Sequence, residues 1–174
     1  MKIACIMLLL LTLTTTNRPY TEPLIIYSSS KHILHKMVYE NNMKNNNPFN
    51  IRQNNNNHWV GKVESNTNHN GFEQFISMKY GIRAGLKLLI NYYNNYELNT
   101  IDKIITKFAP PTENDTEGYI KFVCAKTGYA HDQVIDLNNK TTLLSVAKAI
   151  LKMESNMNAT NDQLNAAFNL LYQP

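Results

Sequence analysis

The spacing of apolar residues predicts several helices in the second half of the chain. From Lys79 onward, apolar side chains recur every three or four positions, which is the period of an amphipathic helix. Stretches with the same period follow after short polar interruptions. We therefore predict helices over residues 79–93, 100–108, 117–126, 141–154 and 164–171.

Residues that favour helix ends occur at the expected positions. Pro110–Pro111 cannot continue the second of these helices, and Asp115 or Thr116 is placed to cap the third. Thr160 and Gln163 have the spacing of a capping box before the last one. These end signals support the helical prediction independently of the apolar period.

A different pattern precedes the helices. Residues 58–64 and 71–77 show partial alternation of apolar and polar positions, and residues 65–70 between them are turn formers. This predicts one small β-hairpin. The fold class expected is therefore mostly α (α+β), a helical domain with one small hairpin.

The first 42 residues differ from the rest. Lys2 is followed by an apolar run from Ile3 to Leu13, the pattern of a secretory signal, although an uncleaved anchor or a buried helix remains an alternative. We expect residues 1–20 to be this signal-like segment, residues 21–42 an irregular lead-in with some helix over 33–39, and residues 43–174 the folded domain. No membrane span is expected to remain after cleavage.

Composition narrows the function classes. The chain has 43% hydrophobic and only 17% charged residues, a net charge of +4, and 26 asparagines among 174 residues. No dense basic run is present, which argues against a dedicated nucleic-acid binder. The two cysteines form no disulfide framework, and we expect no metal and no cofactor because no ligand spacing or glycine-rich phosphate loop occurs. Glycan cleavage suits the remaining isolated carboxylates, since one protonated Glu can act as general acid.

An ordered series of motifs resembles a known family. Residues 46–52 read Asn-Asn-Pro-Phe-Asn-Ile-Arg, Trp59 and Gly61 form Trp-x-Gly, and residues 109–116 read Ala-Pro-Pro-Thr-Glu-Asn-Asp-Thr. This resembles a family of phage and prophage virion structural proteins for which a lysozyme-like fold is expected. The resemblance covers roughly residues 43–155.

A second resemblance concerns the chemistry. The first two motifs are similar to those of bacterial glucosaminidases that cut peptidoglycan. In those enzymes the Glu that acts as general acid lies upstream of these motifs. Here Glu40 is the candidate upstream of Asn46, but residues 146–156 resemble the Glu-Ser helix of lytic transglycosylases. We hypothesise a circularly permuted arrangement in which Glu154 reaches the cleft from the C-terminal side.

Three carboxylates are catalytic candidates. Glu154 is the first choice for the general acid, and Glu113, which follows the rigid proline pair, is the second. The alternatives are a solvated residue at a helix end for Glu154 and charge near a helix N-terminus for Glu113. Glu64 is the third; like Glu73, which is not a candidate, it falls on the predicted hairpin, where such residues would border the cleft or, as we expect for most, simply be exposed.

The resemblance also implies substrate-binding residues. Trp59 would stack on a sugar ring, or else anchor the hairpin in the core. Asn47 and Asn50 would chiefly hold their loop through side chain–backbone bonds. The full set of expected substrate-binding residues is Trp59, Asn47, Asn50, Arg52, Phe72 and Tyr119.

Two functions remain open from the sequence. The first is an exported, phage-related peptidoglycan glycosidase acting on glycan strands in the periplasm or cell envelope. The second is a non-catalytic virion structural or envelope glycan-binding protein with the same fold, which would contact other virion proteins.

Overall fold

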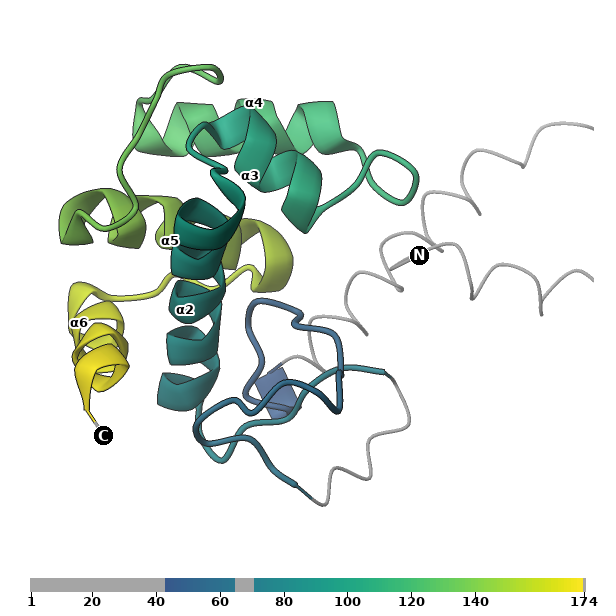
Figure 1. Cartoon of the computed structure of the whole chain (residues 1–174), viewed down its shortest axis with the longest axis vertical. Coiled ribbons are helices and arrows are strands. Elements are labelled where there is room, and N and C mark those ends of the chain that lie inside the picture. Colours follow the sequence, from purple (N-terminus) through teal and green to yellow (C-terminus); the bar gives the residue numbers. More distant parts are fainter. Residues whose placement is uncertain (1–42, 65–70, 174) are drawn as a thin grey trace, which may run out of the picture.

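The computed structural model describes residues 43–64 and 71–173, and these are mostly helical (Figure 1). The expected signal-like segment 1–20, the lead-in 21–42 and the short helix over 33–39 lie outside the described residues. The helices are α2 (Met78–Tyr96), α3 (Ile101–Phe108), α4 (Thr116–Thr127), α5 (Lys140–Ser155) and α6 (Asn161–Asn169), and α6 continues into the 3₁₀ turn η2 (Leu170–Tyr172).

The predicted helices are confirmed, and their ends follow from local capping. The Thr100 side chain accepts a hydrogen bond from the Lys103 amide at the start of α3, and Asp115 accepts one from Gly118 at the start of α4. Thr160 and Gln163 form the predicted capping box of α6. Helix boundaries therefore agree with the sequence to within a few residues.

The predicted β-hairpin does not form as a pair of strands in the part of the chain that the structure describes, and its connection, residues 65–70, lies outside that part. Among the described residues no strand forms, and only two isolated antiparallel bridges occur, Arg52 with Phe72 and Lys62 with Phe75. The segment 71–77 is thus shared between two partners instead of pairing along its length with 58–64. A turn at Trp59–Lys62, in which Gly61 has φ +79°, interrupts the first segment and explains this difference.

Helix α2 is the centre of the fold. It packs against α5 and α6, while α4 packs against both α3 and α5 (Figure 1). The chain end is tied to this centre because the Arg83 guanidinium donates a 3.0 Å hydrogen bond to the Leu170 carbonyl. Large fully buried side chains from these helices, from the segment before α2 and from the connection between α4 and α5 form the core: Phe49, Phe75, Ile82, Leu86, Leu89, Ile101, Ile104, Ile105, Leu137, Leu143, Ile150 and Leu151.

The irregular segment before α2 lies beside the first half of that helix in Figure 1. Two helical glycines permit the approach: a Cβ on Gly81 would meet the Asn46 carbonyl, and one on Gly85 would meet the Phe49 ring. Phe49 is fully buried, so this contact anchors the residues that follow it in the chain. None of the helices in the described ranges is long and apolar enough to cross a membrane.

Candidate functional site

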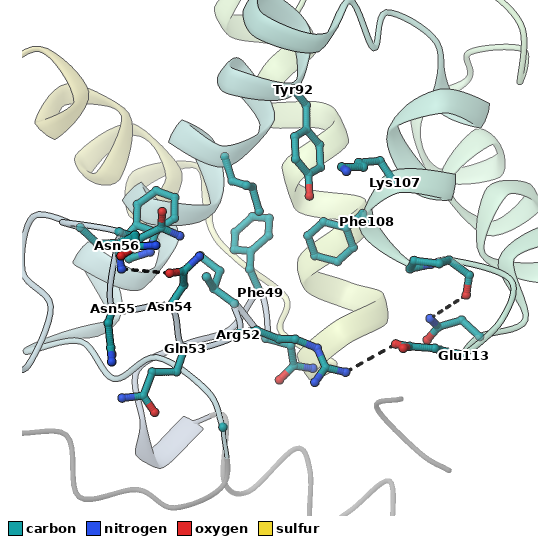
Figure 2. Close-up of a pocket in the computed structure, with 18 residues that line it drawn as sticks. Phe49, Arg52, Gln53, Asn54, Asn55, Asn56, Tyr92, Lys107, Phe108 and Glu113 are labelled. Atoms are coloured by element: carbon teal, nitrogen blue, oxygen red, sulfur yellow. Dashed lines mark hydrogen bonds and ion pairs between the residues drawn. The ribbon is translucent and has the colours of Figure 1, made fainter. Parts of the chain in front are cut away.

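A cleft of about 920 Å³ lies where the irregular segment faces α2, α3 and the loop after α3. Figure 2 shows the asparagine-rich segment on one side and the helical residues with Glu113 on the other. The lining residues are Phe49, Asn50, Ile51, Arg52, Gln53, Asn54, Asn55, Asn56, Asn57, Trp59, Gly71, Leu88, Tyr92, Lys107, Phe108, Pro110, Glu113 and Asn114. Apolar surface, amides and charges of both signs therefore meet in one hollow.

Asn47 holds the wall of this cleft from behind. Its side-chain oxygen accepts from the Ile51 amide at 3.0 Å, and its Nδ2 donates to the carbonyls of Ile51 and Glu73 at 2.9 and 3.0 Å. The side chain is completely buried, so it cannot contact a ligand directly. Of the two roles considered for Asn47, the structure supports holding the loop.

Glu154 does not itself line the cleft; it lies behind Asn50, and both of its carboxylate oxygens accept hydrogen bonds. Asn50 Nδ2 donates to Oε2 at 2.7 Å, and the Tyr119 hydroxyl donates to Oε1 at 3.1 Å. Asn50 lines the cleft, so it connects the carboxylate of α5 to the hollow. The expectation that Asn50 chiefly bonds to the backbone differs from this geometry, because its amide reaches across 104 positions to a side chain.

The Tyr119 hydroxyl is a permanent donor at neutral pH. Burial, together with the neighbouring Glu154 carboxylate, raises the pKa of this phenol well above its usual value. Tyr119 also packs edge-on against Phe108, which lines the cleft. Tyr119, expected as a substrate-binding residue, is only 5% exposed and does not line the cleft; its hydroxyl is directed at Glu154.

Glu113 and Arg52 face each other from opposite sides of the cleft (Figure 2). Arg52 Nη2 lies 3.5 Å from Glu113 Oε2, and both side chains are partly exposed. The Arg52 guanidinium also lies 6.0 Å above the Phe72 ring. Phe72 therefore supports Arg52 and is not itself a lining residue, whereas Trp59 is one.

The carboxylates of the predicted hairpin have different surroundings. Glu64 is exposed and does not line the cleft. Glu73, expected to be exposed, is completely buried and forms a 3.2 Å ion pair with Lys62. The alternative that Glu73 is simply exposed is thus wrong, because its carboxylate is enclosed between Lys62 and the Asn54 amide.

Several lining residues were not identified from the sequence. The asparagine run 54–57, whose composition indicates only a loop, forms one side of the cleft. Tyr92 and Lys107 lie on the opposite side, and burial raises the pKa of the Tyr92 phenol, which keeps it protonated. Tyr92 lies on α2 and Lys107 on α3. Their position at the cleft depends on how these helices pack within the fold, and no local sequence pattern indicates that packing.

Within the described ranges, no group of three or more His, Cys, Asp or Glu side chains is arranged to hold a metal ion. A smaller hollow between α4 and α5 is bordered by Lys126, Lys148 and Lys152. It is separate from the cleft and shares no lining residue with it.

Comparison with known proteins places the chain among phage proteins. No protein-family model matches it. Protein P5 of Pseudoalteromonas phage PM2 is 38% identical over 129 residues, which cover 72% of this chain and 78% of the phage protein. Similarity of that extent is long and specific enough to establish common descent, and the chain belongs to the family of phage PM2 protein P5.

Proposed function

We propose that this phage-family protein is a lysozyme-like glycosidase that cleaves peptidoglycan glycan strands. The observation that carries the proposal is Glu154, whose carboxylate accepts from Tyr119 and from Asn50, a lining residue of the cleft that contains the chain's single tryptophan. A carboxyl group fixed in position behind such a hollow suits general acid catalysis on a glycoside once it has taken up a proton.

The two carboxylates have different partners, which suggests different roles. Glu113 faces the Arg52 guanidinium, and a carboxylate in an ion pair does not carry the proton that a general acid must deliver. Glu154 is held by an amide and a phenol. We propose that Glu154 takes up a proton when the glycan binds and delivers it to the glycosidic oxygen, while the Glu113 carboxylate stabilises positive charge that develops on the sugar or activates water.

The substrate class follows from the lining. Trp59 offers a flat apolar face for a sugar ring, while the amides and Arg52 offer hydrogen bonds to hydroxyl and acetamido groups. We propose export through the N-terminal segment, with action at the periplasm or cell envelope. Contact with other virion proteins is part of the same proposal.

The test is release of sugar ends from purified peptidoglycan by the full chain and by Glu154→Gln and Glu113→Gln. Loss of a general acid is expected to lower the rate by about a hundredfold or more. Gln keeps the shape of Glu and can still form hydrogen bonds with Asn50 and Tyr119. Glu117→Gln is the matched control, because Glu117 is 87% exposed and lies outside the cleft.

A non-catalytic role is the second candidate, and one observation favours it. The carboxylates at the cleft are already engaged, Glu113 with Arg52 and Glu154 with Asn50 and Tyr119. If the folded chain binds sacculi but releases no sugar ends from peptidoglycans of several types, the glycosidase proposal fails. The protein would then be a glycan-binding structural component.

A further inference from the structure

We infer that residues 53–57 recognise the acetamido groups of the glycan, and that the buried Lys62–Glu73 pair positions this segment. The inference deepens the proposed function and rests on its substrate class, but it does not require cleavage. We call residues 53–57 the amide segment, because every member carries a primary amide.

The amide segment is a binding surface by its chemistry. Gln53, Asn54, Asn55 and Asn56 are exposed and line the cleft beside Trp59. Each primary amide supplies two N–H donors and one carbonyl acceptor. An acetamido group presents one N–H and one carbonyl, and this surface can form hydrogen bonds with both. A sugar that carries only hydroxyl groups lacks this pair and is therefore expected to bind less tightly.

The segment has a defined shape. The Asn56 amide donates to Asn54 Oδ1 at 2.9 Å, and the Asn57 amide donates to the Asn54 carbonyl at 3.0 Å. These bonds form a turn with Asn54 at its first position. Asn54 is thereby used for structure, which leaves Gln53, Asn55 and Asn56 as the exposed side chains available for contact, the last two within the turn itself.

A buried cation holds this turn from beneath. Lys62 Nζ donates to the carbonyls of Asn54 and Asn57 at 3.3 and 3.4 Å and to Glu73 Oε1 at 3.2 Å. These three acceptors match the three N–H donors of an ammonium group. Glu73 Oε1 also accepts from the Asn54 amide at 3.1 Å, so both members of the pair contact the turn.

The burial of this pair argues for a geometric role. The Lys62 and Glu73 side chains are only 7% and 0% exposed. Removing two charges from water offsets much or all of their attraction, so a buried pair is a weak source of stability. What the pair does supply is a fixed position for the turn, and hence for the amides at the cleft.

The single tryptophan gives a direct readout of binding. Trp59 lines the cleft beside the amide segment, so its fluorescence reports ligand binding without a label. The full chain is titrated with the pentamer of N-acetylglucosamine and, separately, with the unacetylated glucose pentamer. The acetylated pentamer is expected to bind at least tenfold more tightly.

The first variant tests recognition. Asn55→Ala combined with Asn56→Ala is expected to weaken binding of the acetylated pentamer at least tenfold while leaving the thermal midpoint unchanged, since both side chains are exposed. Asn169→Ala is the control, because Asn169 is an exposed asparagine on α6 outside the cleft. It is expected to change neither quantity.

The second variant tests positioning. Lys62→Met removes the cation but keeps the length of the side chain, and it is expected to weaken binding about as much as the double alanine variant. Leu164→Ala, in the buried face of α6, lowers stability at a distance from the cleft. It is expected to leave affinity unchanged, which separates positioning from a general loss of stability.

The outcomes distinguish this inference from the proposed function. Selective binding without cleavage upholds the inference and contradicts the glycosidase. Cleavage with unchanged affinity in the double alanine variant overturns the inference alone, and unchanged affinity in Lys62→Met removes its positioning part. Equal affinity for both pentamers, or binding of neither, overturns the recognition of acetamido groups.

Discussion

At the scale of single residues, asparagine has three distinct uses around the cleft. Asn46 and Asn50 adopt left-handed backbone conformations with φ of 51° and 54°, which asparagine tolerates better than most residues. Asn47 bonds to backbone groups from a buried position, and Asn50 bonds to the Glu154 carboxylate. The high asparagine content is therefore partly structural, although composition alone does not say which residue has which use.

Tyr119→Phe tests the support of Glu154 at this scale. The variant keeps the ring and its packing against Phe108 but loses a hydrogen bond to a carboxylate, so we expect stability to fall by about 1–3 kcal/mol at neutral pH. Urea unfolding measures this difference. Tyr172→Phe, which removes an exposed hydroxyl, is expected to have little effect.

The same residue predicts an alkaline dependence. The pKa of the Tyr119 phenol is raised in the folded state, so its contribution is fully present below the unfolded value of about 10 and is lost as pH rises beyond it. The wild type is therefore expected to lose more stability above pH 10 than Tyr119→Phe. Thermal midpoints of both proteins between pH 8 and 11 measure this, and parallel curves would contradict it.

At the scale of elements, the helices were predictable because their signals are local. Thr100, Asp115 and Thr160 each accept a hydrogen bond from an amide three positions later, and that spacing is visible in the sequence. The hairpin was not predictable in the same way. Phe72 pairs with Arg52 and Phe75 with Lys62, so the pairing of this segment depends on how the whole loop packs on α2.

Gly85→Ala tests that packing. In an ordinary helix this change stabilises by about 0.5–1 kcal/mol, but here the added methyl group would meet the buried Phe49 ring. We expect a loss of about 1–3 kcal/mol together with weaker glycan binding, because Asn50 follows Phe49 in the wall. Lys87→Ala, on the exposed face of α2, is the control for urea unfolding and Trp59 fluorescence. A more stable Gly85→Ala variant would show that the contact does not constrain the loop.

At the scale of the whole molecule, the site depends on contacts between distant parts of the chain. Asn50, Tyr119 and Glu154 were each named from the sequence, but as separate candidates with different roles. Their hydrogen bonds span 104 and 35 positions, and no local pattern encodes such distances. The motifs thus indicate the three residues one by one. The contacts of α5 with α4 and with the irregular segment bring their side chains together.

The longest of these contacts predicts energetic coupling between the two ends of the domain. In a double-mutant cycle, Asn50→Gly removes the amide while suiting the left-handed backbone, and Glu154→Ala removes the carboxylate that accepts from it. Because the hydrogen bond is short, partly buried and charge-assisted, we expect a coupling energy of about 1–3 kcal/mol in urea unfolding. Asn50→Gly combined with Glu117→Gln, whose side chains have no contact, is the control and should be additive. Additivity in both cycles would mean that the Asn50–Glu154 bond joins the cleft wall to α5 without stabilising the fold, and that Glu154 owes its position to Tyr119 and to α5 alone.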